Sequence, residues 1–290
     1  MELVIENLCK QYSNGVVALD NVTLTIGKGM FGLLGPNGAG KSSLMRTLAT
    51  LQDADSGSAM LGDTDVLNNK DAVRKMLGYL PQEFGVYPRT SAVDLLEHLA
   101  VLKGFTNKAE RKEMVAHLLA MTNLYEHRKK HVSSYSGGMR QRFGIAQSLI
   151  GNPSLVIVDE PTAGLDPGER NRFYGILGEI GEQVIVILST HIVQDVRELC
   201  PTMAIMDKGK VLYSGPTDQA ILLVKDKIWE RKIEKDELTT YRQNFRTVSE
   251  KLIGGKPLVH VFSEQVPAQG FVAAEENLED VFFAKLNGLV

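Results

Sequence analysis

One short segment restricts the fold of this chain more than any other: GPNGAGKSS, residues 35–43. The run MFGLLG before it is predicted to be a buried strand, and a helix is predicted to begin at Lys41. The segment has the spacing G-x-x-x-x-G-K-[ST], set by Gly35, Gly40, Lys41 and Ser42. Because this loop joins a strand to a helix, it predicts an α/β sheet with an anion-binding loop at one strand end.

The residue types of this loop suit a nucleotide triphosphate. Glycines let the backbone curl so that successive amides face the phosphates, and the helix N-terminus adds positive potential. Lys41 is expected to span the terminal phosphates, and the Ser42 hydroxyl to ligate Mg²⁺. A glycine-rich turn that binds nothing is the alternative, which the lysine and hydroxyl disfavour. The candidate contacts to ATP in this loop are Gly35, Pro36, Asn37, Gly38, Ala39, Gly40, Lys41, Ser42 and Ser43.

Polar residues follow three other apolar runs. SLVIVD ends in Asp159 and leads into Glu160, the run VIVILS leads to His191, and GYLP leads to Gln82. Ligands of open α/β sheets collect beyond the carboxyl ends of the strands. Asp159 therefore suits Mg²⁺, directly or through water, and Glu160 suits the orientation or deprotonation of the attacking water. A solvated turn is the alternative for these two carboxylates.

His191 and Gln82 are assigned on weaker grounds. A lone histidine is more often structural, but the position of His191 beside the Asp-Glu strand favours contact with the terminal phosphate. Gln82 could complete the Mg²⁺ or water shell, although spacing alone does not separate this role from a structural one.

A second anion-binding device occurs in SSYSGGMRQR. Ser136, Gly137 and Gly138 present a hydroxyl and free amides at the start of a predicted amphipathic helix. The loop at residues 35–43 already surrounds one side of the nucleotide. We therefore expect the second device to act on a nucleotide held by a second subunit.

Composition limits the possible functions. The chain has 32 Lys and Arg against 35 Asp and Glu, which argues against a main role in holding nucleic acid or anionic lipid. Its two cysteines, Cys9 and Cys200, favour a reducing cytosolic setting. The start MELVIENLCK has no secretory pattern, and the longest apolar runs are strand-sized, so we expect no membrane crossing. His127 and His131 in HRKKH are interpreted as a solvated basic run and not as a metal site.

The pattern along the chain predicts one cassette with additions. An antiparallel hairpin opens the chain, the helical pattern of residues 91–125 indicates an insertion, and the runs SLVIVD and VIVILS are typical of central parallel strands. The segments KIWERKI, PLVHVF and NLEDVFFAKLNG indicate a small α+β tail, whose last helix is capped by Asn277. We expect a main domain at 1–217, with a helical subdomain at about 83–135, and an accessory domain at 218–290.

The ordered set GPNGAGKS, Gln82, YSGGM, VIVDEP, GLD and STH resembles the ATP-binding subunit of an ABC transporter over about residues 1–217. The resemblance implies a P-loop NTPase fold and a head-to-tail dimer that encloses two ATP molecules with Mg²⁺. It implies that Tyr12 stacks on adenine, that Asp166 communicates across the dimer, and that the helical insertion docks a permease helix. The catalytic set would be Lys41, Gln82, Glu160 and His191.

Some residues depart from the usual family pattern. The signature segment begins with Tyr135 and has Met139 where leucine and glutamine are usual, and Ser43 replaces a commoner threonine. The form YSGGMRQR and the tail NLEDVFF resemble exporter ATPases that work with separate permeases. The resemblance thus implies a homodimeric or heterodimeric ATPase at the cytoplasmic face of the cell membrane. Two alternatives are an ABC-type ATPase that acts on DNA or ribosomes and a regulatory module that binds ATP without hydrolysis.

Overall fold

A computed structural model describes residues 1–82, 85 and 89–290, and a six-stranded sheet lies at its centre. The strands are β3 (Gly29–Leu34), β6 (Leu77–Leu80), β7 (Leu155–Asp159), β8 (Ile185–Thr190), β9 (Thr202–Asp207) and β10 (Lys210–Pro216). Their order is β10-β9-β3-β8-β7-β6, and all neighbours are parallel except the β9–β10 pair. The expected α/β core with adjacent parallel strands β7 and β8 is confirmed.

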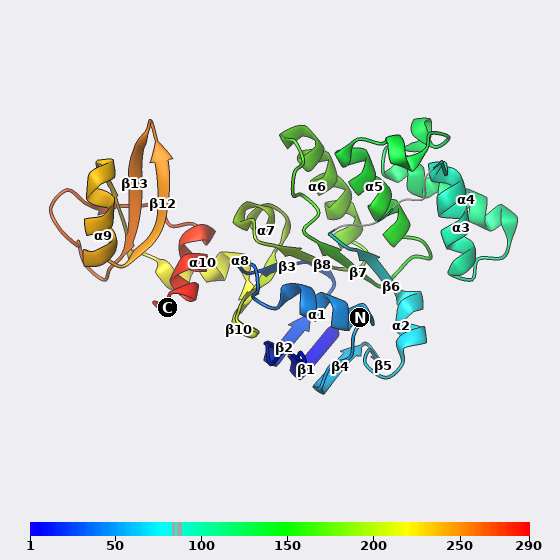
Figure 1. The fold of residues 1–290 in the computed structure, drawn as a ribbon, viewed down its shortest axis with the longest axis horizontal. Coiled ribbons are helices and arrows are strands. Elements are labelled where there is room, and N and C mark those ends of the chain that lie inside the picture. Colours follow the sequence, from blue (N-terminus) through cyan, green and yellow to red (C-terminus); the bar gives the residue numbers. More distant parts are fainter. Residues whose placement is uncertain (83–84, 86–88) are drawn as a thin grey trace.

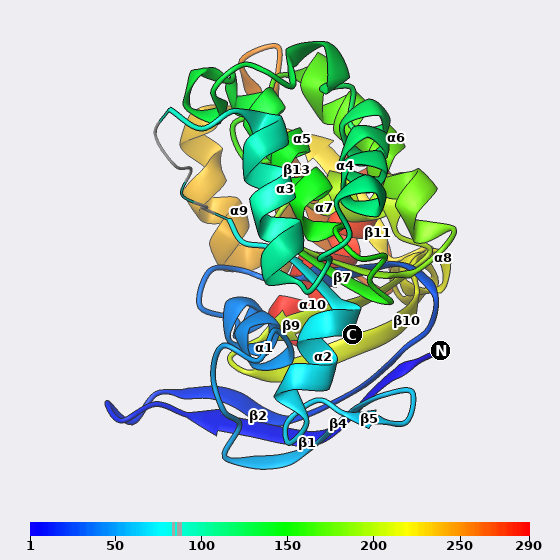
Figure 2. The same cartoon turned by 90° about the vertical axis from the view of Figure 1, so that its right-hand side faces the viewer.

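A second, antiparallel sheet forms the lower layer in Figure 2. It has the order β2-β1-β4-β5, from β1 (Leu3–Gln11), β2 (Val17–Ile26), β4 (Ser56–Leu61) and β5 (Thr64–Asp65). The predicted opening hairpin is confirmed, with the Tyr12 amide donating to the Val16 carbonyl at 2.9 Å across its turn. Helix α1 (Lys41–Leu48) contacts both sheets, and α2 (Lys70–Met76) leads into β6.

Helices cover the other face of the central sheet. They are α3 (Ala92–Leu102), α4 (Lys108–Met121), α5 (Gly137–Ser148), α6 (Pro167–Gly181) and α7 (Val193–Leu199). The helical pattern expected over residues 91–125 is divided in two, because Gly104 has a φ of +98° and the Asn107 side chain caps a new helix. The expected start of the helical subdomain, Glu83, lies outside the described residues.

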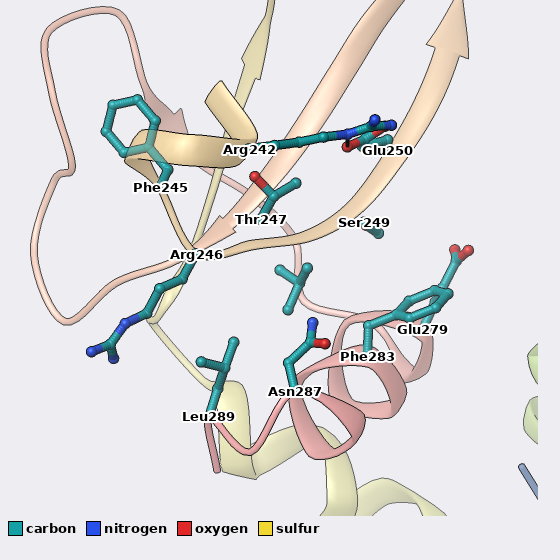
Figure 3. Close-up of a pocket in the computed structure, with 11 residues that line it drawn as sticks. Arg242, Phe245, Arg246, Thr247, Ser249, Glu250, Glu279, Phe283, Asn287 and Leu289 are labelled. Atoms are coloured by element: carbon teal, nitrogen blue, oxygen red, sulfur yellow. Dashed lines mark hydrogen bonds and ion pairs between the residues drawn. The ribbon is translucent and has the colours of Figure 1, made fainter. Parts of the chain in front are cut away.

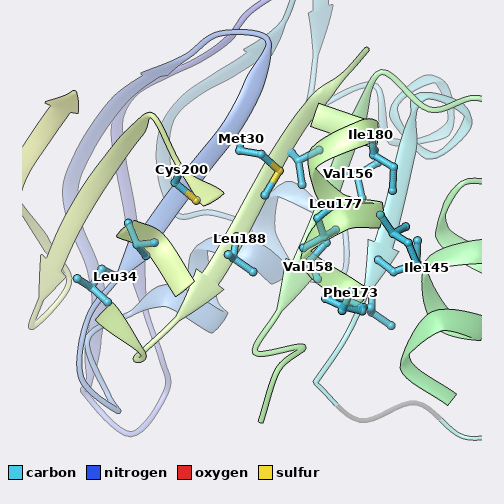
Figure 4. Close-up of a cluster of buried hydrophobic side chains, with 14 of the residues drawn as sticks. Met30, Leu34, Ile145, Val156, Val158, Phe173, Leu177, Ile180, Leu188 and Cys200 are labelled. Atoms are coloured by element: carbon cyan, nitrogen blue, oxygen red, sulfur yellow. The ribbon is translucent and has the colours of Figure 1, made fainter. Parts of the chain in front are cut away.

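The main core lies between the central sheet and these helices. Figure 4 shows Val156 and Val158 of β7 and Leu188 of β8 facing Phe173 and Leu177 of α6. Every residue of β7 and β8 is buried. Both runs are apolar because strands covered on two faces have no solvent side on which polar residues would be favoured.

The C-terminal region builds a third sheet, which stands apart from the others in Figure 1. Its elements are α8 (Thr217–Ile221), β11 (Ile228–Lys232), α9 (Leu238–Asn244), β12 (Thr247–Ile253), β13 (Lys256–Phe262), β14 (Val272–Ala273) and α10 (Leu278–Leu286). The Asn277 cap is confirmed, and Leu278, Val281 and Phe282 are buried as the helical stripe predicts. Because α10 packs on α7 and α8 as well as β12, it joins the third sheet to the central core. Among the described helices, none is both long and apolar enough to cross a membrane.

A buried polar cluster joins α10 to this third sheet. His260 Nδ1 lies 2.8 Å from Asp280 Oδ1, the Ser249 hydroxyl donates to the same oxygen at 3.2 Å, and His260 Nε2 lies 3.3 Å from Glu230. Burial lowers the pKa of His260, but the hydrogen bond and charge of Asp280, with the charge of Glu230, outweigh burial and raise this pKa above its ordinary value. The cluster therefore favours the charged imidazolium in the folded chain.

The sign of this pKa shift sets a pH dependence. A raised folded-state pKa stabilises the fold fully below the ordinary histidine value of about 6.5, and the contribution is lost as pH rises through the folded-state pKa. We expect His260→Gln to lower the free energy of unfolding more at pH 6 than at pH 9, and Asp280→Asn to cost about 3 kcal/mol at pH 6, because the buried imidazolium then keeps only the Glu230 carboxylate at 3.3 Å. Denaturant titrations at both pH values would check this, and equal losses at the two pH values would contradict it.

Candidate nucleotide-binding site

The predicted phosphate loop connects β3 to α1. Gly38 and Gly40 have φ values of +82° and +104°, and a Cβ at Gly40 would lie 2.4 Å from the Ala18 carbonyl oxygen. Both positions therefore require glycine. Among the described residues, no side-chain oxygen caps α1, and its first turn holds no acidic residue, so its amides and its dipole remain available to an anion.

Lys41 lies in the interior of this loop. Its side chain is 5% exposed, and Nζ donates to the carbonyl oxygens of Gly35 at 2.6 Å and Pro36 at 3.2 Å. Burial lowers the pKa of Lys41, while the charges of Glu160 and Asp159 raise it in part. A buried ammonium beside free amides gives the loop a strong preference for anions.

The predicted polar strand ends converge on Glu160. The Glu160 Oε1 atom lies 3.1 Å from His191 Nδ1 and 4.0 Å from Lys41 Nζ, and Gln82 Nε2 donates to Oε2 at 3.3 Å. Glu160 adopts a left-handed backbone with φ of +46°, a conformation that costs energy in a residue other than glycine. The chain thus leaves β7 in a sharp turn that brings the carboxylate to three groups from three other segments.

Asp159 lies beneath this cluster and does not line the pocket surface. Its Oδ1 atom and the neighbouring Ser189 hydroxyl are buried, and neither has a hydrogen-bond partner among the described residues. Burial is the main cause that raises the pKa of Asp159, and the charge of Glu160 adds to it, whereas the nearby Ser189 hydroxyl and the charge of Lys41 lower it in part. An orphaned buried carboxylate oxygen is costly without a cation or water, so this position fits Mg²⁺ together with the Ser42 hydroxyl.

A pocket of about 450 Å³ brings most of the predicted contacts together. The side chain of Tyr12 is held at its edge, since the hydroxyl lies 3.0 Å from Ser43 Oγ and donates to Gln52 at 3.1 Å. Val16 and Ala18, which belong to none of the motifs, lie shortly after Tyr12 and line the same pocket. The lining residues are Tyr12, Val16, Ala18, Asn37, Gly38, Ala39, Gly40, Lys41, Ser42, Ser43, Gln82 and Glu160.

The second predicted anion device is well formed but does not line this pocket. The Ser136 hydroxyl accepts from the Met139 amide and caps α5. Tyr135, one of the departures from the family pattern, is buried, donates its hydroxyl hydrogen to the His127 carbonyl at 2.9 Å, and packs edge-on against Phe143. This tyrosine anchors the segment in the helical layer from its N-terminal side.

A salt-bridge network ties this segment to α6. Arg142 donates to the Glu169 carboxylate at 3.2 Å, and Arg172 donates to the same carboxylate at 2.6 Å. A Cβ at Gly138 would lie 2.3 Å from Glu169 Oε2, so the second glycine lets the carboxylate lie against the start of α5. Asp166 caps α6 through the Glu169 amide and, like Ser136, lies outside the pocket lining.

Another hollow, of about 570 Å³, lies in the C-terminal region between β12 and α10. Figure 3 shows Arg242 beside Glu250, with which it forms a hydrogen-bonded ion pair at 2.7 Å. Phe283 and Leu289 line the opposite wall. Among the described residues, no glycine-rich loop lines this hollow, and the first turn of α10 that reaches it carries the acidic Glu279, so the pocket around Lys41 is the better candidate for binding phosphate.

The strand–loop–helix at β3 and α1, with polar residues gathered at the ends of β6, β7 and β8, defines a P-loop nucleotide-hydrolysing protein. Residues 19–163 match the family described as ABC transporter. The chain belongs to this family: it is an ABC transporter ATP-binding protein and an ATPase that uses ATP with Mg²⁺.

The relatives agree with this assignment. The uncharacterized ABC transporter ATP-binding protein YxlF of Bacillus subtilis (strain 168) is 31% identical, covering 97% of this chain and 98% of its own length. The daunorubicin/doxorubicin resistance ATP-binding protein DrrA of Streptomyces peucetius is 36% identical over 73% of this chain and 64% of its own. The methionine import ATP-binding protein MetN of Xanthomonas euvesicatoria pv. vesicatoria (strain 85-10) is 33% identical, covering 80% of this chain and 72% of its own length.

Solved structures confirm the cassette fold. The structure of cbiO1 from Clostridium perfringens, part of the cbiONQ transporter complex, has a TM-score of 0.69 at 25% identity. The match covers 76% of this chain and 90% of the cbiO1 chain. The similarity covers the cassette and leaves part of this chain outside the match.

Proposed function

We propose that this chain is the motor subunit of an exporter: two copies, or this chain and a related one, close on two ATP molecules, hydrolyse them and drive a separate permease. The observation that carries the proposal is the convergence of Gln82, His191 and Lys41 on the Glu160 carboxylate, at the mouth of a complete phosphate loop. Phosphoryl transfer depends mostly on positioning and charge stabilisation, which this arrangement supplies.

Each residue of the cluster has a separate role in this proposal. Glu160 orients the attacking water and accepts its proton as the bond from phosphorus to the ADP oxygen breaks. His191 donates from Nδ1 to Glu160, and when both ring nitrogens carry hydrogen it can also donate from Nε2 to a terminal phosphate oxygen. Lys41 exchanges its two loop carbonyls for phosphate oxygens. Ser42 and Asp159, with Gln82 completing the shell, would hold Mg²⁺, which would supply charge neutralisation on the phosphates.

The nucleotide site is proposed to be shared between two protomers. The loop at residues 35–43 and Tyr12 line one pocket, whereas Ser136, Gly137 and Gly138 form a second anion-binding helix start outside it. Because a phosphate loop covers only one side of ATP, the second helix start is free to close on the nucleotide of a partner. Asp166, at the start of α6, would then lie near the shared interface.

A permease is the proposed partner, with the chain at the cytoplasmic face of the membrane. Relatives include drug-resistance ATP-binding proteins and also methionine import ATP-binding proteins. The segments YSGGMRQR and NLEDVFF, together with the resistance relatives, favour the outward direction. The helical layer of α3 and α4 is the proposed docking face for the permease.

We also propose that the cassette comprises residues 1–217 and that residues 218–290 form an accessory unit. The support is a separate sheet with a small core of its own, made by Ile233, Tyr241, Val259, Val261 and Phe271. The contact of α10 with α7 means that this unit shares part of the main core.

Glu160→Gln tests the assigned chemistry. We expect turnover to fall at least about 100-fold, because the general base is lost, while ATP affinity stays within about threefold and a nucleotide-trapped dimer accumulates. Phosphate release, equilibrium ATP binding and size-exclusion chromatography with Mg·ATP would measure these properties. Glu182→Gln, an exposed carboxylate at the far end of α6, serves as the control. Undiminished hydrolysis by Glu160→Gln would remove Glu160 from its role.

A mixing experiment tests the shared site. Lys41→Ala and Ser136→Arg should each be inactive alone, because one damages the phosphate loop and the other the segment lent to the partner. In a mixed dimer both defects fall on one site and the other site is intact, so mixing equal amounts should restore a measurable fraction of turnover. If each site lay within one protomer, the mixture would stay as inactive as its parts.

Fractionation of cells tests the proposed partner. Epitope-tagged full-length chain should sediment with membranes and be released when the permease gene is deleted, while its amount stays unchanged. Deletion of an unrelated permease is the control. Copurification with ribosomes or duplex DNA, and not with membranes, would replace the transport assignment with the alternative.

A further inference from the structure

A buried carboxylate lies behind the catalytic strand ends and has no role in the site described above. Asp195, in the first turn of α7, is 0% exposed and takes part in none of the ion pairs between described residues. It accepts hydrogen bonds from three hydroxyl groups. Burying an unpaired carboxylate is costly, and an apolar side chain would fill the same place at lower cost.

Two of the three hydroxyls lie next to the catalytic side chains, one in the loop after β7 and one at the end of β8. Thr162 follows Glu160 by two residues and donates to Asp195 Oδ2 at 2.5 Å. Thr190 directly precedes His191 and donates to the same oxygen at 3.2 Å. One carboxylate oxygen therefore joins the loop after β7 to the end of β8.

This bridge lies next to the contact between the two catalytic residues. Thr190 also accepts from the Ile192 amide at 3.0 Å, so both sides of His191 are held. The Nδ1–Oε1 distance of 3.1 Å between His191 and Glu160 then depends on where the two loops are fixed. His191 is itself 47% exposed, so surrounding packing does little to hold its ring.

The third hydroxyl belongs to Tyr174 of α6, which donates to the other oxygen, Oδ1, at 2.5 Å. Burial, then the hydrogen bond and charge of Asp195, raise the pKa of Tyr174. The phenol therefore stays protonated and donates at neutral pH. Unlike the two threonines, Tyr174 is attached to a helix and to neither catalytic loop.

We infer that Asp195 is a positioning residue for ATP hydrolysis, which holds the loops of Glu160 and His191 in register through its Oδ2 atom. Asp195 does not contact the nucleotide and acts only through these two loops. The inference rests on the proposed roles of Glu160 and His191, and it adds a residue that neither motif contains. Small misplacements of catalytic groups lower rates strongly, which is how a buried contact of this kind affects turnover.

The three hydroxyls provide an internal control. Thr162→Val and Tyr174→Phe each remove one buried hydrogen bond to the same carboxylate, so we expect similar losses of melting temperature, whereas Thr190→Val also removes the acceptor of the Ile192 amide and should lose somewhat more. We expect kcat to fall roughly 10-fold or more in each threonine variant and less than about twofold in Tyr174→Phe. The ATP dissociation constant should stay within about twofold in all three. The purified full-length chain with Mg·ATP is used throughout.

Two further variants sharpen the result. Thr162→Val and Thr190→Val break one bridge, so the double variant should lose little more turnover than the more damaged single variant. Asp195→Asn should lower kcat roughly 10- to 100-fold with ATP affinity retained. If Asp195→Asn does not fold, the hydroxyl variants decide the question.

The outcomes separate this inference from the proposed function. Turnover that follows melting temperature equally in all three hydroxyl variants, or threonine variants that keep full kcat, would overturn the positioning role. If Glu160→Gln is inactive while the threonine variants remain active, this inference alone fails. If Glu160→Gln hydrolyses ATP normally, both the proposed role of Glu160 and this inference fail.

Discussion

The site depends on the register of parallel strands in the central sheet. Leu34 of β3 lies opposite Thr190 of β8, and Asp159 of β7 lies opposite Ser189 of β8. Because this register ends the strands at one level, the loops that follow them begin side by side. The same hydrogen-bond ladder that stabilises the sheet therefore also sets the distances between the phosphate loop, Glu160 and His191.

This arrangement places destabilising groups around the sheet, namely buried charges and a strained backbone, which a core selected only for stability would not contain. Lys41, Asp159 and Asp195 are buried, Glu160 has a left-handed backbone, and the phosphate loop leaves helix amides uncapped. Burial raises the pKa of Asp159 and lowers that of Lys41, which means that burial disfavours the charged form of each group. A bound ion of opposite charge would stabilise that charged form. Local backbone strain and polar groups without hydrogen-bond partners are typical of sites that bind a ligand.

The helical layer presents the signature segment through equally specific contacts. Tyr135 stands where the family pattern has leucine; it is buried, and its hydroxyl donates to the His127 carbonyl. Glu169 joins α6 to the start of α5 by lying over Gly138. The helix that begins at Asp166 therefore contacts both the signature helix and, through Tyr174, the Asp195 cluster. The last helix, α10, extends this packing by covering part of α7.

Several features followed from the sequence because they depend on local chemistry. The strands β3, β7 and β8, the loop at residues 35–43, and the Asn277 cap were all predictable, since apolar runs, glycine spacing and capping residues act over a few positions. The break between α3 and α4 was missed because one glycine inside a helical pattern has several structural meanings. Val16 and Ala18 were missed because no motif includes them and only the fold brings them to the loop at residues 35–43, and Asp195 was missed because its bridge depends on Thr162, which is distant in sequence.

The sequence by itself determined the phosphate-binding loop, the polar residues that follow each strand and the membership in a nucleotide-hydrolysing class. Only the tertiary structure decided that β8 lies between β3 and β7, which places His191 beside Glu160, and that the Thr162 and Thr190 hydroxyls meet on one carboxylate. The physical reason is range. Backbone preferences and spacing operate between neighbours in the chain, whereas strand order and side-chain contacts are chosen by the packing of the whole core.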